Sequence, residues 1–301
     1  MPLRVGFVGL GTMGAPMARN LAKAGFPLTL ANRTASKSRA LAEELSREGG
    51  TARASESYEE VGRGSEVVVT CLPDAPQVEE VLFGAAGVAG GLGAGAVVVD
   101  CSTIAAESAR AIAGCLAERK VEFLDAPASG GQKGAVEGTL TFFVGGNAAA
   151  LERARPVFDA MGKRVTHLGP SGAGQLGKAT NQILVAGNLI AVSEAIAFAQ
   201  KVGLPLRPLH DALTAGAARS WALEVLGAKM IERDFKPAFA IKHQQKDLAI
   251  LLRTAREKGV SLPGAALVHQ LLSALEAQGR GEDGTQALLT LYESMANPHG
   301  T

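Results

Sequence analysis

The sequence predicts two domains of different class: an α/β domain over residues 1–170 with a doubly wound, mostly parallel sheet, and an all-helical domain over residues 171–301. Two observations predict this fold. Short apolar runs alternate with helical patterns in the first half of the chain, which is typical of a parallel sheet covered on both faces. From Gly172 onward the strand patterns stop and long helical patterns follow. The length of 301 residues also suits two domains.

Each predicted strand is a short apolar run that ends in a turn, and each predicted helix shows apolar residues at helical spacing. The strands are expected at 4–8, 28–31, 67–72, 96–100, 122–126, 140–144 and 165–168. The helices of the first domain are expected at 13–24, 35–48, 77–83, 105–119 and 148–161, and those of the second at 174–202, 206–216, 220–232, 241–258, 262–278 and 285–296. The helix from Gly174 is apolar nearly all round, which favours burial by neighbouring helices or by a second subunit.

A glycine motif separates the first predicted strand from the first predicted helix: Gly9, Leu10, Gly11, Thr12, Met13 and Gly14. G-x-G-x-x-G between a strand and a helix indicates dinucleotide binding. Gly9 permits a tight turn, Gly11 lets the backbone approach the pyrophosphate, and Gly14 lets helix and strand pack closely. The free N–H groups of the helix then face the phosphates. We therefore expect a Rossmann domain in which all six residues contact the dinucleotide.

The end of the second strand favours NADP(H) over NAD(H). An NAD-preferring site usually has a carboxylate there, to accept hydrogen bonds from the ribose 2′-OH. This chain has Asn32, Arg33 and Thr34, with Lys37 one helical turn on. An arginine can pair with a 2′-phosphate that a carboxylate would repel. In the alternative interpretation Asn32 and Thr34 cap the following helix, and both roles can hold together.

Three further loops follow parallel strands and are expected at one edge of the sheet, where ligands bind in open α/β folds. They contain Leu72-Pro73, Ser102-Thr103 and Ser129-Gly130-Gly131. Taken alone, Pro73 is more typical of a strand terminator, and the Ser-Gly-Gly sequence of a simple turn.

Lys178 opens the apolar helix of the second domain, and Asn181 and Gln182 share its helix face. Burial of a lysine lowers its pKa, and such a lysine can donate and recover a proton. In the alternative interpretation, Lys178 is a long side chain that reaches water from the end of the helix.

Together these residues resemble the β-hydroxyacid dehydrogenase family over nearly the whole chain. The matching segments are Val8–Gly14, Asp100–Thr103, Asp125–Gly131, Gly172–Gly174 with Lys178 and Asn181, and Lys242–Leu248. The resemblance implies hydride transfer between a nicotinamide and a small acid that carries an aldehyde or ketone. It also implies an N-terminal Rossmann domain, a helical C-terminal domain and an active site between them.

The resemblance implies roles for individual residues. Lys178 corresponds to the general acid of reduction and the base of oxidation. Ser129, Gly130 and Gly131 correspond to the turn that binds the substrate carboxylate, and Asn181 and Gln182 to a polar pair at the substrate. The expected cofactor contacts, in addition to those already named, are Leu72, Pro73, Thr103 and Lys246, of which Lys246 is also expected near the substrate.

The motifs point to more than one substrate group. Lys178 to Gln182 is similar to tartronate semialdehyde reductases, whereas Lys242 to Asp247 and Asn32 to Thr34 are similar to NADPH-dependent glyoxylate and succinic semialdehyde reductases. We therefore expect an NADP(H)-dependent reductase of one of these three substrates, with NAD(H) as a second possible cofactor. The alternatives are a 3-hydroxyisobutyrate dehydrogenase, an imine reductase, which usually lacks this lysine, and a catalytically silent nucleotide-binding module.

Composition excludes other classes. The net charge is +1 and no Lys/Arg run occurs, so we expect no nucleic-acid partner. No apolar stretch reaches membrane-spanning length by inspection, and the cysteines and histidines show no metal-ligand spacing. Three cysteines with no secretion signal favour a reducing cytoplasm. We expect no metal, a small carboxylate-bearing substrate, and a homodimer or homotetramer.

Overall fold

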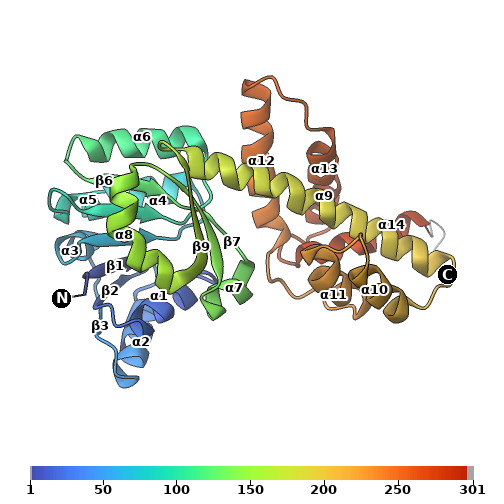
Figure 1. The fold of residues 1–301 in the computed structure, drawn as a ribbon, viewed down its shortest axis with the longest axis horizontal. Helices are drawn as coiled ribbons and strands as arrows, with labels where there is room; N and C mark the ends of the chain where they lie inside the picture. The colour runs from blue at the N-terminus through green and yellow to red at the C-terminus, as the bar shows by residue number, and fades with distance from the viewer. Residues whose placement is uncertain (1, 297–301) are drawn as a thin grey trace. The chain divides into compact units, whose positions relative to one another are not determined.

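The computed structural model describes residues 2–296 (Figure 1). By its internal contacts the chain divides into two compact units, one that ends at Lys178 and one that begins at Ala179. The sequence placed this boundary at 170/171. By packing it falls inside the long helix α9 (Ala173–Lys201), because the first turns of α9 contact the sheet of the first unit.

The first unit is built on one mixed sheet, of nine strands within residues 2–296. The strands are β1 (Val5–Val8), β2 (Leu28–Ala31), β3 (Ala52–Ala54), β4 (Val67–Thr70), β5 (Val97–Asp100), β6 (Glu122–Asp125), β7 (Ala128–Ser129), β8 (Leu140–Gly145) and β9 (Gly162–Gly169). Strands β3-β2-β1-β4-β5-β6 are parallel in that order, and β8 pairs antiparallel with β6 and β7 and parallel with β9.

The register brings the carboxyl ends of the parallel strands to one edge. Val8 pairs with both Ala31 and Thr70, Thr70 with Asp100, and Asp100 with Asp125. The loops that follow these residues therefore start side by side. This is the edge at which open parallel sheets bind ligands.

Helices cover both faces of this sheet, as the alternation of strand side chains requires. They are α1 (Gly14–Lys23), α2 (Ala35–Arg47), α3 (Tyr58–Arg63), α4 (Ala75–Phe83), α5 (Val88–Gly91), α6 (Ala106–Ala117), α7 (Gly131–Glu137) and α8 (Ala148–Met161). Phe7 packs into the core with α1, α2 and α8, whereas its neighbour Val8 packs with α3, α4, α5 and α6. The doubly wound α/β class is confirmed.

The second unit is helical. It contains most of α9, then α10 (Leu206–Ala215), a π-helix (Ala222–Gly227), α11 (Ala228–Ile231), α12 (Ile241–Glu257), α13 (Pro263–Ala277), a 3₁₀ turn (Thr285–Ala287) and α14 (Leu288–Ala296). Its core joins Leu189 and Ile196 of α9 to Leu248 of α12 and Leu272 of α13. The predicted helix 220–232 is a π-helix followed by one α-turn, and 285–296 begins as a 3₁₀ turn.

Helix α9 contradicts the expectation that no apolar stretch is long enough to span a membrane. Its 29 residues include a window with mean hydropathy 1.6, so by length and composition alone α9 is able to cross a membrane. Its apolar side chains instead form the centre of the second unit: Ala186 and Leu189 are at most 1% exposed, and the hydroxyl of buried Ser193 donates to the Leu189 carbonyl. The helix therefore has the packing of a core helix.

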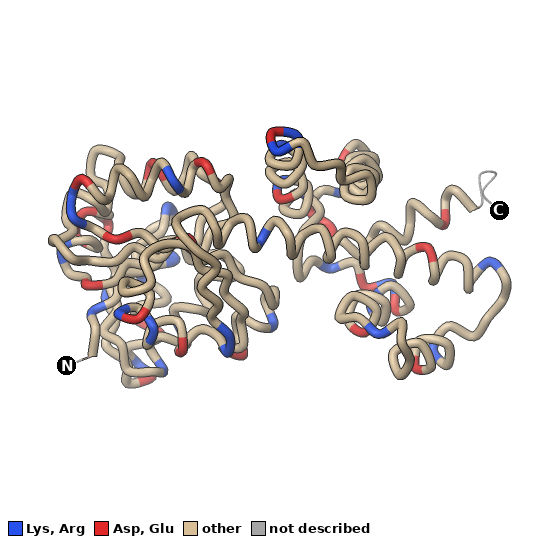
Figure 2. The backbone as a smooth tube through the Cα atoms, turned by 45° about the horizontal axis from the view of Figure 1, so that its top comes forward, with Lys and Arg blue, Asp and Glu red and all other residues tan. Residues whose placement is uncertain are grey.

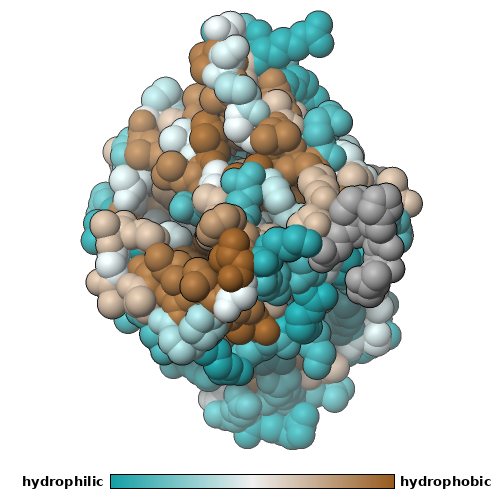
Figure 3. Space-filling model, turned by 90° about the vertical axis from the view of Figure 1, so that its right-hand side faces the viewer, coloured by the Kyte–Doolittle hydropathy of each residue, from teal (hydrophilic) through white to brown (hydrophobic). Residues whose placement is uncertain are grey.

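Charges of the two signs are interleaved over the surface, whereas exposed apolar residues gather in patches (Figure 2, Figure 3). Figure 2 shows Lys and Arg positions interleaved with Asp and Glu positions along both units. Figure 3 shows apolar patches beside polar areas on one face of the molecule. The exposed large apolar side chains of the second unit are Leu184, Phe198, Val202, Leu204, Trp221, Val260, Leu267 and Met295.

Candidate active site

The glycine-rich turn between β1 and α1 fits a bound dinucleotide. Gly9 has a φ of 100°, which favours glycine, and a Cβ there would lie 2.2 Å from the carbonyl oxygen of Cys71. A Cβ on Gly14 would lie 1.9 Å from the carbonyl oxygen of Gly9. By contrast, a Cβ on Gly11 would meet nothing within 4 Å. The backbone at Gly11 therefore faces open space, as the approach of a pyrophosphate requires.

Asn32 fastens this turn to the end of β2. Its Oδ1 accepts a 3.0 Å hydrogen bond from the backbone N–H of Leu10, and its Nδ2 donates to the Thr34 carbonyl at 3.2 Å. Thr34 occupies the N-cap position of α2 but makes no side-chain capping bond. Arg33, Thr34 and Lys37 are exposed. The alternative interpretation, in which Asn32 and Thr34 cap α2, is therefore wrong: Asn32 holds the loop, and the Thr34 side chain makes no capping bond.

Ser102 ties together the loops that follow β4 and β5. Its hydroxyl donates to Asp100 Oδ1 at 2.6 Å and accepts from the backbone N–H of Leu72 at 2.8 Å. The carboxyl group of Asp100 is fully buried. Pro73 and Thr103 follow directly in these loops. The structure therefore brings the two predicted loops to the same edge of the sheet.

The Ser129 turn is shaped by two glycines. Gly130 has a φ of 130° and Gly131 a φ of 61°, in the region that favours glycine over other residues. Ser129 ends β7, where it pairs with Thr141 of β8, and α7 begins at Gly131. The turn therefore leads directly from a strand into a helix.

Lys178 lies beside this turn. Its Nζ donates a 2.8 Å hydrogen bond to the carbonyl oxygen of Ala128, the residue that precedes Ser129. The residue is 9% exposed. This contact lies within the first unit, so the lysine is held by the unit that carries the glycine-rich turn. An ammonium in this position can donate a proton to an oxygen bound at the turn.

The start of α9 is held by Asp125, at the end of β6. Asp125 Oδ1 accepts from the backbone N–H of Gly172 at 2.7 Å, and Oδ2 accepts from that of Gln175 at 2.9 Å. The Gln175 side chain in turn accepts from the N–H of Ile104 and donates to the Ser102 carbonyl. Burial raises the pKa of Asp125 from 3.8 to about 6, although the hydrogen bonds from Gly172 and Gln175 act in the opposite direction.

In the second unit, three predicted residues meet around Asp247. Lys246 Nζ lies 3.1 Å from Asp247 Oδ1, and Gln182 Nε2 donates to Asp247 Oδ2 at 2.8 Å. Asn181 Nδ2 donates to Gln182 Oε1 at 2.9 Å. Both polar atoms of the Gln182 amide are therefore engaged. Among the predicted residues of this unit, Lys246 carries the only charge.

Two family patterns cover most of the chain. Residues 4–169 match the family described as the NAD binding domain of 6-phosphogluconate dehydrogenase, and residues 172–292 match the NAD-binding domain of NADP-dependent 3-hydroxyisobutyrate dehydrogenase. The chain is also 41% identical over 295 residues to 2-hydroxy-3-oxopropionate reductase of Escherichia coli (strain K12), covering 98% of this chain and 99% of that one. The chain belongs to the β-hydroxyacid dehydrogenase family.

Solved structures of similar proteins agree with this assignment. A 3-hydroxyisobutyrate dehydrogenase from Salmonella typhimurium has a TM-score of 0.86 and 31% identity, over 96% of this chain and 99% of that one. Psf3, determined in complex with NADP+ and 2-OPP, has a TM-score of 0.86 and 26% identity, over 95% of this chain and 99% of that one. This β-hydroxyacid dehydrogenase is therefore an oxidoreductase for hydroxy acids and semialdehydes, with NAD(P)-binding domains.

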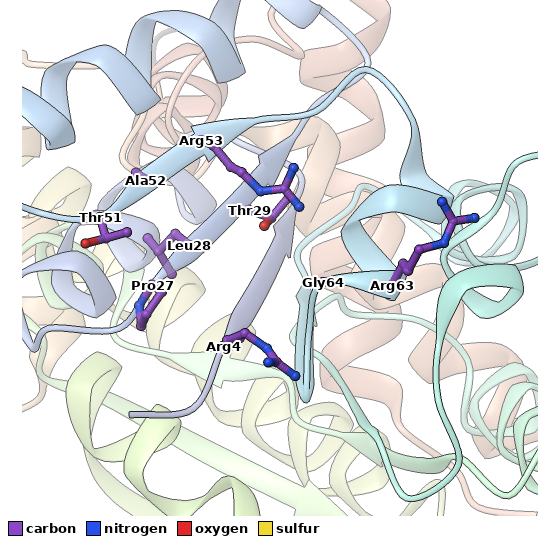
Figure 4. A pocket seen from close by; sticks show the side chains of 9 residues that line it. All are labelled: Arg4, Pro27, Leu28, Thr29, Thr51, Ala52, Arg53, Arg63 and Gly64. Atoms are coloured by element: carbon purple, nitrogen blue, oxygen red, sulfur yellow. The ribbon is translucent and has the colours of Figure 1, made fainter. Parts of the chain in front are cut away.

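A cavity of about 400 Å³ in the first unit is separate from these residues. It lies at the opposite, amino-terminal ends of β1, β2 and β3, and its nine lining residues include none of the predicted site residues (Figure 4). Of its three arginines, Arg4 lies 3.8 Å from Glu66, and Arg63 is hydrogen-bonded to Glu59. These carboxylates offset much of the positive charge around the cavity.

Sequence reasoning gave no role to three buried residues that support the site of this β-hydroxyacid dehydrogenase. Asp125 and Asp247 lie inside motifs that carried the family resemblance, and Gln175 follows Gly174 in the first turn of α9. A carboxylate at the end of an apolar strand is itself a signal, because a buried charge needs hydrogen-bond donors around it. The partners of Asp125, two backbone N–H groups 47 and 50 residues away, have no pattern in the sequence.

Proposed function

We propose that this enzyme is an NADP(H)-dependent semialdehyde reductase whose main substrate is 2-hydroxy-3-oxopropionate (tartronate semialdehyde), with succinic semialdehyde and glyoxylate as related substrates. The observation that carries the proposal is the 2.8 Å hydrogen bond from Lys178 to the Ala128 carbonyl, which holds an ammonium beside the Ser129 turn. The choice of substrate is supported by 41% identity to a 2-hydroxy-3-oxopropionate reductase.

Lys178 acts on the substrate oxygen. As the carbonyl is reduced, negative charge develops on its oxygen, and a nearby ammonium stabilises that charge before it transfers a proton. In the oxidation direction the neutral amine recovers the proton from the hydroxyl group. The bound nicotinamide supplies the hydride for reduction and accepts it in oxidation.

The substrate carboxylate binds at the Ser129 turn, through the hydroxyl of Ser129 and the backbone N–H groups of Gly130 and Gly131. Such a turn offers several donors to one anion without a full positive charge. In the second unit Asn181 and Lys246 contact the substrate, and Lys246 also contacts the cofactor. Gln182 contributes by orienting Asn181, since its Oε1 accepts from Asn181 Nδ2.

The preference for NADP(H) comes from the residues after β2. The exposed side chains of Arg33, Thr34 and Lys37 bind the 2′-phosphate, and Thr34 has its hydroxyl available because it does not cap α2. Asn32 has one acceptor oxygen where a carboxylate has two, and this Oδ1 already accepts a hydrogen bond from the Leu10 N–H. NAD(H) therefore loses the contact that usually favours it.

Initial rates with a substrate panel test the proposal: 2-hydroxy-3-oxopropionate, succinic semialdehyde and glyoxylate with NADPH and NADH, and 3-hydroxyisobutyrate with NADP+ and NAD+. We expect the highest kcat/KM for 2-hydroxy-3-oxopropionate with NADPH. The second candidate is a 3-hydroxyisobutyrate dehydrogenase, which the solved relative with a TM-score of 0.86 favours. A higher kcat/KM for 3-hydroxyisobutyrate with NAD+ would establish that candidate instead.

We also place the enzyme in the cytoplasm. The chain has three cysteines, Cys71, Cys101 and Cys115, and an odd number cannot pair completely within one chain. Reduced thiols persist in a reducing compartment. Fractionation of the source cells, with activity measured in the soluble and membrane fractions, tests this location.

A further inference from the structure

We infer that Asp125 is a positioning residue for Lys178: its carboxylate fixes the first turn of α9 and so sets where the lysine ammonium lies relative to the Ser129 turn. The inference rests on the proposed role of Lys178 as proton donor. The Asp125 side chain accepts hydrogen bonds from the backbone of Gly172 and Gln175. It acts through the backbone of α9.

A pair of hydrogen bonds holds the start of α9. The first N–H groups of a helix have no partner within the helix. At the start of α9, the Asp125 carboxylate accepts hydrogen bonds from two backbone N–H groups, that of Gly172 at 2.7 Å and that of Gln175 at 2.9 Å. A bidentate carboxylate fixes both the position of the helix start and its rotation about the axis.

The backbone packs closely around these two hydrogen bonds. A Cβ on Gly174 would lie 2.2 Å from the Asp125 carbonyl oxygen, and a Cβ on Gly145 would lie 2.5 Å from Asp125 Oδ1. Both positions therefore exclude a side chain. Gln175, which is 3% exposed, adds two hydrogen bonds to the loop after β5. The helix start is thus held to two adjacent strand ends.

The contacts of Asp125 and Gln175 at the start of α9, called the clamp below, are linked to the amine of Lys178. Lys178 lies one turn after Gln175 on α9, and its Nζ donates to Ala128, three residues after Asp125. One short segment, 125–128, therefore binds α9 at its first turn and at the lysine side chain. A small rotation of the helix start would move Nζ away from the Ala128 carbonyl, and misplacement by about 1 Å can lower a rate by about 10²-fold.

Burial of the carboxylate gives the clamp a pH dependence. The pKa of Asp125 is raised to about 6, chiefly by burial, with a further contribution from Asp100 on β5. The other charged or titratable groups near the clamp are Arg110 and its partner Glu107 on α6 beside Gly172, His167 on β9, which bonds the Gly146 carbonyl, and Lys178 itself. The ionised carboxylate accepts both N–H bonds, and protonation weakens them.

A double-mutant cycle tests the inference, with single-turnover rates followed by NADPH absorbance. We expect Asp125→Asn to lower kcat by about tenfold or more while the NADPH dissociation constant stays within about twofold. In the Lys178→Ala background the same change should alter kcat by less than about twofold, because residues that act as a unit are not additive. The matched control is Ser65→Ala: Ser65 is also a buried polar residue of the first unit, and its hydroxyl donates to the Val61 carbonyl of α3. Its effect on kcat should be the same in both backgrounds.

The outcomes separate the inference from the proposed function. If Lys178→Ala leaves kcat unchanged, the proposed function fails and the inference fails with it. If Lys178→Ala lowers kcat but Asp125→Asn lowers kcat equally in both backgrounds, the inference alone is overturned. If Asp125→Asn does not fold, as judged by circular dichroism and NADPH binding, Gln175→Leu takes its place in the same cycle, with the same expected results.

The pH profile supplies a readout that a purely structural role would not change. The wild-type kcat should fall below an apparent pKa near 6 as Asp125 is protonated. Asp125→Asn should lack this acidic limb, whereas His167→Gln should retain it. An acidic limb that persists in Asp125→Asn contradicts the inference.

Discussion

The Nζ of Lys178 and the carbonyl oxygen of Ala128 are 2.8 Å apart, in a hydrogen bond that joins the first turns of α9 to β7. Ala128 is fixed by its pairing with Phe142 of β8. The ammonium is therefore held by the sheet that also carries the glycine-rich turn.

Replacement of Lys178 should remove the proton donor of the reaction and leave cofactor binding intact. We expect Lys178→Ala to lower kcat by about 10²-fold or more, the usual scale for loss of a positioned proton donor, with the NADPH dissociation constant unchanged. Steady-state rates and fluorescence titration with NADPH measure the two quantities. The control is Lys201→Ala, on the same helix, whose Nζ bonds the Ala296 carbonyl and which should keep the wild-type kcat.

Replacement of Arg33 should change cofactor selectivity. We expect Arg33→Ala to weaken NADPH by about 1–3 kcal/mol, because a charge-assisted hydrogen bond to the 2′-phosphate is lost, and to leave NADH nearly unchanged. Titration of both cofactors checks this. Arg39→Ala, at an exposed arginine of α2 paired with Glu56, is the matched control and should alter neither affinity.

Asn32→Ala should behave differently from Arg33→Ala. The hydrogen bond from the Leu10 N–H to Asn32 Oδ1 fixes the glycine-rich turn, which contacts the part common to both cofactors. We therefore expect NADPH and NADH to be weakened by the same amount, of about 1 kcal/mol. A selective loss of NADPH binding in this variant would mean that Asn32 contacts the 2′-phosphate directly.

Asp125 should make stability depend on pH in a defined direction. Its pKa is about 6 in the fold against 3.8 for the free group, so the folded state holds this proton more tightly than the unfolded state. Its contribution to stability is therefore fully present below pH 3.8 and is lost as pH rises through about 6. About two pKa units correspond to about 3 kcal/mol.

The measurement is the unfolding temperature of the wild type and of Asp125→Asn between pH 4 and 7.5. Because the variant has no carboxyl group at this position, its stability relative to wild type should increase as the pH rises. A difference between the two proteins that does not change with pH would show that the carboxyl group titrates at its ordinary pKa.

Helix α9 should mediate self-association. Between Leu184 and Phe198 its exposed residues recur at helical spacing on one face. Leu184 is 66% and Phe198 67% exposed, and the small residues Gly187, Ala191 and Ala195 lie between them. Small residues let a second helix approach closely. We expect a homodimer or homotetramer by light scattering, and a smaller species for Leu184→Lys with Phe198→Lys. Val260→Lys, away from α9, is the control.

The sequence predicted the repeated elements well and the irregular ones poorly. Strands such as Val67–Thr70 are short apolar runs. Their side chains point alternately to the two faces of the sheet, and both faces are buried by helices, so every position is apolar or small. The short strand Ala52–Ala54 was not predicted, because at the edge of the sheet it is only partly buried and has no apolar run. Helix α7 was also not predicted, since its sequence begins with glycine and contains a second one.

The candidate site shows the same division. The glycine-rich turn and Lys178 were predicted because their chemistry depends on local sequence. The clamp at Asp125 and the hydrogen bond from the Leu10 N–H to Asn32 were not predicted, because each joins residues that are far apart in the chain and that only the fold brings together.

Protonation of Asp125 has opposite effects on the stability of the fold and on the rate of turnover. At low pH the protonated carboxyl group of Asp125 increases the stability of the first unit, but it holds the amine of Lys178 less precisely beside the Ser129 turn. Acidification would therefore slow turnover while the first unit stays folded, and a return to neutral pH would restore the rate.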